Sequence, residues 1–128
     1  MNVLVLSNGK LKQKNINNTL EALQEIVGGY IEIPFLSEIF FKNEIDIIIN
    51  DEGKFIEGLN PEIAIVRKGD NQIADIVYGN CIFASHDEQG ETVSLSDEQI
   101  KVITEELKDV ILTNQETGEI NTIKALLI

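Results

Sequence analysis

The sequence contains one cysteine, one histidine and no tryptophan among its 128 residues. A single cysteine, Cys81, excludes an internal disulfide and is typical of a reducing cytoplasm. With only His86 beside it, the chain offers no set of thiolates and imidazoles at the spacing of a zinc site. Carboxylates alone would hold calcium or magnesium only weakly. We therefore expect no metal and no other cofactor.

Basic residues are also scarce, because ten lysines and arginines stand against 22 acidic residues and the net charge is −12. Arg67 is the only arginine. Binding to a nucleic-acid backbone by counterion release requires several basic residues on one face, so direct nucleic-acid binding is not expected. Strong acidity most often serves solubility. The alternative is an acidic surface that imitates nucleic acid or binds a basic protein.

No apolar run approaches the roughly 20 residues that a membrane-spanning helix requires, so no membrane partner is expected. The first residues lack the length and basic lead of a secretory signal and instead predict a strand. A 43% share of hydrophobic residues indicates a packed core. We expect a single α+β domain over residues 1–111, mainly an antiparallel sheet built from hairpins. Residues 112–128 are a C-terminal extension, for which a closing strand and a homodimer contact remain alternatives.

Alternating and β-branched runs separated by turn residues predict the strands. The Asn8-Gly9 pair predicts a type I′ turn between strand 2–8 and a polar second strand. Lys10, Lys12 and Lys14 lie on one side of this second strand, which favours a protected sheet edge over a phosphate site. The other predicted strands are 30–36, 45–50, 55–57, 63–66, 73–85 with a bulge at Gly79, and 91–95.

Residues 19–28 are predicted to form a helix that packs on the sheet. Asn18 is the expected N-cap, with Glu21 completing a capping box. The apolar stripe consists of Leu20, Leu23, Ile26 and Val27. Gly28 and Gly29 end the helix, because a residue without Cβ adopts the left-handed conformation that terminates it.

A second helix is predicted over residues 97–111. Ser96 is its N-cap and Gln99 completes a capping box. Its expected buried stripe consists of Ile100, Ile103, Leu107, Val110 and Ile111. Residues 37–44 fit either a short helix or a loop, in which the adjacent Phe40-Phe41 pair points two ways and can leave one ring exposed.

The sequence offers no convincing catalytic arrangement. Ser85-His86-Asp87 has the residue types of a triad, but neighbours on an extended strand point in opposite directions. Cys81 with His86 is a nucleophile–base alternative, although a cysteine in an apolar strand is typical of an inert core thiol. A carboxylate pair among the 22 acids is the remaining enzymatic alternative. We expect a protein that is not an enzyme.

Two sets of residues are candidates for binding. The candidates for contact with a small ligand are Tyr30, Arg67, Tyr78 and Asn80. Among them Arg67 best suits a carboxylate or phosphate. The candidates for an acidic docking face, all within the second predicted helix, are Asp97, Glu98, Glu105, Glu106 and Asp109.

Four segments, taken in order, resemble one protein family. They are Thr19–Glu32, Asn50–Lys54 followed by Gly58–Asn60, Ile76–Asn80, and Val93–Ile100. In this order they look like the small phage and mobile-element proteins that contain domain of unknown function 3846. The most specific part is the helix ending Val27-Gly28-Gly29-Tyr30-Ile31-Glu32, and the resemblance covers roughly residues 1–111. The chain departs from the family pattern at Asn60-Pro61 and in the tail after Ile111.

The resemblance implies a bacterial or phage origin and an accessory role in a mobile element, and it carries no catalytic residues. Three functional hypotheses follow. In the first, a non-enzymatic accessory protein inhibits a host defence or restriction protein through its acidic surface. The second is a protein that sequesters a nucleotide signal and uses Arg67. The third is a small enzyme that uses Cys81 or a carboxylate pair.

Overall fold

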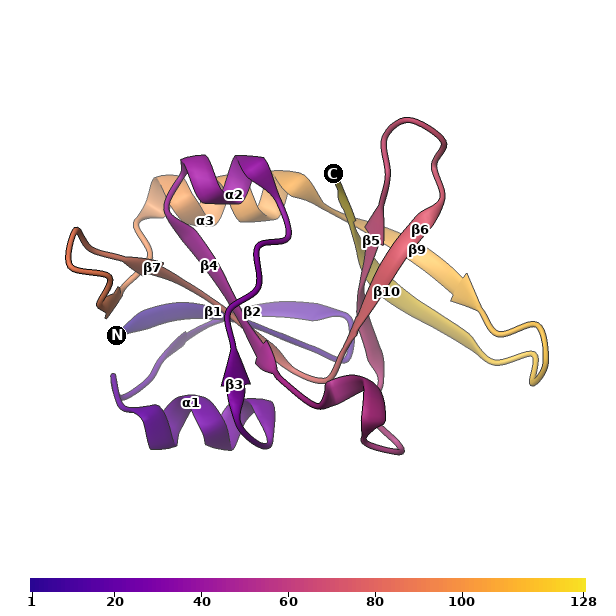
Figure 1. Cartoon of the computed structure of the whole chain (residues 1–128), viewed down its shortest axis with the longest axis horizontal. Coiled ribbons are helices and arrows are strands. Elements are labelled where there is room, and N and C mark those ends of the chain that lie inside the picture. The colour runs from indigo at the N-terminus through magenta and orange to yellow at the C-terminus, as the bar shows by residue number, and fades with distance from the viewer.

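The computed structural model describes residues 1–128 and places ten strands in two sheets (Figure 1). The first sheet has the strand order β2-β1-β7-β4-β3, and β8 pairs with β7. Its strands are β1 (Asn2–Ser7), β2 (Lys10–Asn15), β3 (Ile31–Glu32), β4 (Ile45–Asn50), β7 (Cys81–His86) and β8 (Thr92–Val93). The second sheet has the order β6-β5-β10-β9. Its strands are β5 (Pro61–Val66), β6 (Ile73–Tyr78), β9 (Leu107–Thr113) and β10 (Ile120–Leu127).

Strand pairing is antiparallel everywhere except between β5 and β10, which run parallel. The predicted α+β class and the mainly antiparallel pairing are therefore confirmed. The prediction of one sheet is wrong, because the chain changes sheet at Gly79. Residues 73–85 form not one bulged strand but β6 in the second sheet and β7 in the first. Gly79 has a φ of +86°, a conformation that lets a glycine turn the chain sharply between them.

Each face of the first sheet buries its own core. On one face, Val3 and Val5 of β1 pack against α1 (Leu20–Val27). On the other face, Leu4 and Leu6 belong to a larger core that also takes side chains from α2, α3 and the second sheet. Because successive side chains of β1 point to opposite faces, α1 packs on one face of the first sheet, and α2, α3 and the second sheet contribute to the core on the other face. Figure 1 shows α1 below the sheet.

The hairpin between β1 and β2 has the predicted turn. Asn8 and Gly9 both have positive φ, 53° and 77°, which defines type I′. Strand β2 pairs only with β1 and forms the edge of the sheet, so the edge position predicted from its lysines is confirmed.

Helix α1 is capped one residue later than predicted. The Thr19 side chain, not that of Asn18, accepts the capping hydrogen bond from the Ala22 amide. The Asn18 side chain instead donates to the Thr92 carbonyl and links the helix start to β8. Leu20 is largely exposed and lies outside the buried stripe. The predicted C-cap at Gly28 is confirmed by its φ of +83°.

The strand predicted over 30–36 is too long, because only two of its residues, Ile31 and Glu32 (β3), pair with β4. Pro34 lacks the N–H that a ladder requires. The following segment forms α2 (Glu38–Lys42), which the Ser37 side chain caps. In α2, Phe40 is buried and Phe41 is 66% exposed.

After β4 the chain does not return as a hairpin, so the strand predicted over 55–57 is wrong. Gly53–Phe55 instead form one turn of 3₁₀ helix, η1. A Cβ on Gly53 would lie 2.7 Å from the carbonyl oxygen of Tyr78. The absence of that Cβ therefore lets the turn pack against the end of β6.

Helix α3 (Asp97–Glu106) begins with the predicted capping box between Ser96 and Gln99. It ends at Glu106, so the prediction of a helix over 97–111 is wrong. Residues Leu107–Thr113 form β9, whose seven residues all pair with β10. Strand β10 lies between β5 and β9, so the expected extension over 112–128 supplies a central strand of the second sheet.

Candidate functional site

The end of α1 is held by two asparagine side chains, one at the end of β4 and one in the connection between β6 and β7. The Asn50 amide at the end of β4 donates to the Val27 carbonyl, and the Asn80 amide donates to the Ile26 carbonyl, both at 3.1 Å. These carbonyls belong to the last turn, where helical partners are missing. Asn80, a predicted ligand contact, is thus engaged in holding the helix. The sequence analysis did not identify Asn50 as a residue that holds the helix. The signal that could have identified it is a polar residue at the end of an apolar strand.

Three segments that carry the family resemblance meet at this junction. Besides the two asparagines, the Asp51 amide donates to the Tyr30 carbonyl at 3.0 Å. The Gly79 amide donates to the Asn60 carbonyl at 2.9 Å. The helix ending, the turn after β4 and the β6–β7 connection therefore form one structural unit.

A hollow of about 310 Å³ opens beside this junction, between β3, the turn after β4, and β6. Its rim carries an ion pair in which Lys54 Nζ lies 2.5 Å from Asp75 Oδ1. The hydrogen bond from Lys54 lowers the pKa of Asp75, partial burial opposes this effect, and the Ile76 amide supports it. Tyr78 lines this hollow as well.

A second hollow of about 240 Å³ lies next to the first and shares Pro34 and Leu36 with it. Phe35 and Phe41 line it, with ring centroids 5.6 Å apart and planes tilted by 58°. Both rings are about two-thirds exposed, at 65% and 66%. Asp46 is the one charged residue in its lining.

We call the two hollows together with Phe35, Phe41 and Phe55 the aromatic groove. Seven of the thirteen large exposed hydrophobic residues lie in the stretch 30–56 that surrounds it. The charged residues that line the two hollows are Glu32, Asp46, Asp51, Lys54 and Asp75. The groove is therefore apolar and net negative. Among its residues, the sequence analysis named Tyr78 as a ligand contact and allowed one exposed ring in the Phe40-Phe41 pair, whereas the exposure of Phe35 and Phe55 depends on the tertiary structure.

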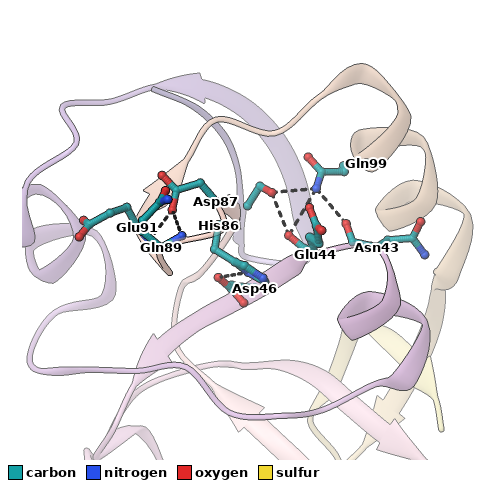
Figure 2. A network of polar contacts seen from close by, with 9 residues as sticks. Asn43, Glu44, Asp46, His86, Asp87, Gln89, Glu91 and Gln99 are labelled. Carbon is teal, nitrogen blue, oxygen red and sulfur yellow. Dashed lines mark hydrogen bonds and ion pairs between the residues drawn. The ribbon is translucent and has the colours of Figure 1, made fainter.

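Asp46 is positioned by a histidine from the neighbouring strand. Its Oδ2 lies 3.0 Å from His86 Nδ1 (Figure 2). Ser85 points elsewhere, to the Glu44 carbonyl, and the Asp87 carboxylate accepts from backbone amides in its own turn. Ser85, His86 and Asp87 are thus not hydrogen-bonded to one another as a triad.

Gln99 extends this polar network to α3. Its side-chain amide donates to the Asn43 carbonyl and to Ser85 Oγ, each at 2.9 Å (Figure 2). The same side chain accepts from the Ser96 amide in the capping box. One glutamine therefore caps α3 and fixes it to the connection before β4.

Cys81 is completely buried. Burial, with a smaller contribution from the Glu62 carboxylate, raises the pKa of its thiol. Cys81 and His86 stand at opposite ends of β7, roughly 17 Å apart at the rise of a strand. They form no nucleophile–base pair. No group of three or more His, Cys, Asp or Glu residues is arranged to hold a metal ion.

The four predicted ligand contacts do not gather. Arg67 is in an ion pair with Asp70 in the β5–β6 loop, at the opposite end of that hairpin from Tyr78. Tyr30 is 73% exposed and lines neither hollow. The candidate docking acids are also spread. Asp97 and Glu98 begin α3, and Glu105 and Glu106 end it. Asp109 lies on β9, where its carboxylate is 2.6 Å from Lys124 Nζ.

These features define a two-sheet α+β protein with an exposed aromatic groove. A family model described as Domain of unknown function (DUF3846) matches residues 1–108. The chain belongs to this family. No match is found among curated proteins or among solved structures. None of the helices has the length and hydropathy needed to cross a membrane.

Proposed function

We propose that this protein is a non-enzymatic accessory protein of a phage or mobile element. In this proposal it acts in the cytoplasm of the bacterial host by binding a host protein of a defence or restriction system. The observation that carries the proposal is the exposure of Phe35, Phe41 and Phe55 around two adjoining hollows. This aromatic groove replaces the acids of α3 as the central docking surface.

Exposed aromatic side chains at a concave surface are characteristic of protein interfaces. A soluble chain that keeps such rings in water gains binding free energy when a partner covers them. The ring of Phe55 is 87% exposed, although the chain has only five phenylalanines. The partner would bring apolar side chains to the groove and basic side chains to its acidic border.

The remaining acids support the same interaction at longer range. A net charge of −12 attracts a basic surface and accelerates its encounter. Asp97, Glu98, Glu105 and Glu106 belong to this field without forming a single patch with Asp109.

The test compares three tagged proteins in bacterial lysate at low salt, with mass spectrometry of what they retain. The groove variant carries Phe35→Ser and Phe41→Ser. Its matched control carries Ile111→Ser and Ile120→Ser, which remove two comparably exposed side chains from the β9–β10 hairpin. We expect a protein retained by the wild type and the control but lost from the groove variant. Equal retention by all three would contradict the proposal.

A second candidate function is sequestration of a phosphate-bearing small molecule. Lys10, Lys12 and Lys14 line a hollow of about 420 Å³ with Ser7 and Asn8, and none of these lysines is in an ion pair. This site suits a nucleotide better than Arg67, which Asp70 already engages. A nucleotide panel in a thermal-shift assay tests it. Stabilisation by a nucleotide that is lost in Lys12→Gln and kept in Lys101→Gln would support this function. The absence of a thermal shift with every nucleotide would contradict it.

A further inference from the structure

We propose that the protein forms a symmetric dimer in which β9 pairs antiparallel with β9 of a second copy, centred on Ile111. The inference goes beyond the proposed function, because no residue of β9 or β10 lines the two hollows of the aromatic groove. It follows from three properties of β9: a free row of backbone groups, the lack of any protecting feature, and a self-complementary order of side chains.

The outer edge of β9 carries backbone groups without a partner. The strand pairs only with β10, and in Figure 1 this hairpin extends beyond the rest of the molecule. At its end the Asn114 amide donates to the carbonyl of Glu119. Asn114 and every second residue before it therefore point their backbone groups toward β10. The alternate residues, Asp109, Ile111 and Thr113, point their N–H and C=O groups away from the sheet.

The other edge strands have features that prevent pairing with another chain. Strand β2 carries alternating lysines, and β3 and β8 have two residues each. Strand β6 pairs irregularly with β5, with two register shifts. In contrast, β9 has no proline, and its seven residues pair with β10 without a register shift. A regular, unprotected edge of this length indicates that a further strand pairs with it.

Only the register centred on Ile111 uses all of the outward backbone groups. In this register Ile111 lies opposite Ile111 of the second copy, and Asp109 lies opposite Thr113 of the second copy. A shift of the centre by one residue toward α3 would place Thr113 opposite Leu107, whose amide already donates within α3. A shift by one residue toward the turn would leave Asp109 opposite the turn instead of the strand. The backbone therefore selects a second copy in one register.

The side chains fit the same register. Ile111, which is 71% exposed, meets its counterpart on the symmetry axis, and Val110 lies opposite Leu112 of the second copy. Such apolar cross-strand pairs stabilise a sheet. Lys108 makes no ion pair within its own chain and comes one strand away from Glu119 of the second copy. No like charges lie directly opposite each other, so the edge is complementary to itself.

The net charge determines how this dimer responds to salt. Two copies that each carry a charge of −12 repel each other at long range, and salt screens this repulsion. Salt does not screen the backbone hydrogen bonds and apolar contacts of the paired strands. Dimerisation should therefore strengthen as salt rises, whereas attraction of a basic partner weakens.

Sedimentation velocity at protein concentrations up to about 0.5 mM separates the 14.3 kDa monomer from its dimer. We expect a closed dimer whose affinity rises about threefold between about 50 and about 300 mM NaCl. Ile111→Lys should weaken dimerisation about tenfold, because two ammonium groups would meet on the symmetry axis. Ile120→Lys is the matched control, since it changes the charge equally at a 66% exposed position of the same hairpin, away from the edge. It should dimerise like the wild type.

A cysteine at the centre tests the register, in a Cys81→Ala background. Opposite residues of this kind have Cα atoms about 5.5 Å apart, a separation that a disulfide spans. Under mild oxidation Ile111→Cys should therefore form a cross-linked dimer, and Ile120→Cys should not. Equal cross-linking of these two variants would contradict the register.

A monomer at every concentration, species larger than a dimer, or equal dimerisation of Ile111→Lys and Ile120→Lys would overturn the inference. The two proposals fail separately. A host protein captured by a wild-type chain that stays monomeric would keep the proposed function and reject the dimer. A dimer without a captured host protein would do the reverse.

Discussion

The backbone amide of Gly9 donates a 2.8 Å hydrogen bond to Oε1 of the buried Glu62 side chain. The Asn8 amide donates to Oε2 of the same carboxylate, also at 2.8 Å. Gly9 belongs to the turn of the first sheet, and Glu62 lies on β5 of the second. One carboxylate therefore satisfies both central amides of a tight turn and joins the two sheets.

Glu62→Gln should lower the free energy of unfolding by about 1–3 kcal/mol. A glutamine has only one acceptor oxygen, so one of the two turn amides would face an NH₂ group. Urea unfolding measures the change, and the exposed Glu57→Gln is the control. Equal stabilities of the two variants would show that the carboxylate contributes nothing at this position.

Gly9→Ala should destabilise the protein by about 2–4 kcal/mol. The backbone has a φ of +77°, and a Cβ at this residue would overlap the carbonyl oxygen of Thr122 on β10. Gly69→Ala is the matched control, because its Cβ would meet open space at an ordinary φ. Thermal unfolding compares them. A Gly9→Ala protein as stable as the control would disprove the close approach between hairpin and β10.

Asn50→Ala and Asn80→Ala should each cost about 1–2 kcal/mol, since each removes the side-chain donor to a carbonyl at the end of α1. The loss should be larger for Asn50, whose Oδ1 also accepts from the Glu52 amide. Hydrogen exchange of the α1 amides should accelerate in both variants. Asn17→Ala, at an exposed position before the helix, is the control. Unchanged exchange in both would show that the asparagines do not hold the helix.

The stability of the wild type should fall with rising pH above about 9, the ordinary pKa of the Cys81 thiol. Burial raises the folded-state pKa, so the unfolded chain loses this proton first and becomes favoured as the pH rises. One proton gives a slope of about 1.4 kcal/mol per pH unit. Cys81→Ala should lack this component when both proteins are unfolded by urea between pH 8 and 10.5. Parallel pH profiles would contradict the prediction.

Lys54→Met should raise the pKa of Asp75 toward its ordinary value of 3.8, because the Lys54 hydrogen bond is the main cause of its depression. An NMR titration of the Asp75 carboxyl measures this. Lys42→Met, which removes a lysine that makes no ion pair, should leave the pKa unchanged. If both variants titrate like the wild type, the ion pair on the rim of the groove does not form in solution.

Local signals predicted the local structure. The type I′ turn at Asn8 and Gly9, the capping box of Ser96 and Gln99, and the helix stop at Gly28 each depend on a few neighbouring residues, and all are present. The predictions from the sequence were wrong where pairing with a distant segment determines the local structure. Leu107, Val110 and Ile111 have the spacing of a helix stripe, yet they lie in β9, all of which pairs with β10. Gly79 indicated a bulge because nothing local shows that the strands beside it join different sheets.

The candidate site was less predictable for the same reason. The adjacent Phe40-Phe41 pair indicated that one ring could be exposed, but only the structure shows that it is Phe41. Exposure of Phe35 and Phe55 results from Pro34, which ends β3 early, and from the 3₁₀ turn that replaces a hairpin. The position of the Asp46 carboxylate depends on its contact with His86, which lies 40 residues away in the sequence.

The position of β10 determines when each sheet can form during synthesis. Every strand of the first sheet precedes residue 94, so that sheet can assemble while the rest of the chain is still on the ribosome. Strand β5 keeps one edge unpaired until β10 emerges, and its Ile63, Ala64 and Ile65 are buried only in the complete molecule. An unpaired apolar edge invites pairing with other chains. A nascent chain that stalls near residue 108, where the family match ends, would thus present a finished first sheet beside an aggregation-prone hairpin.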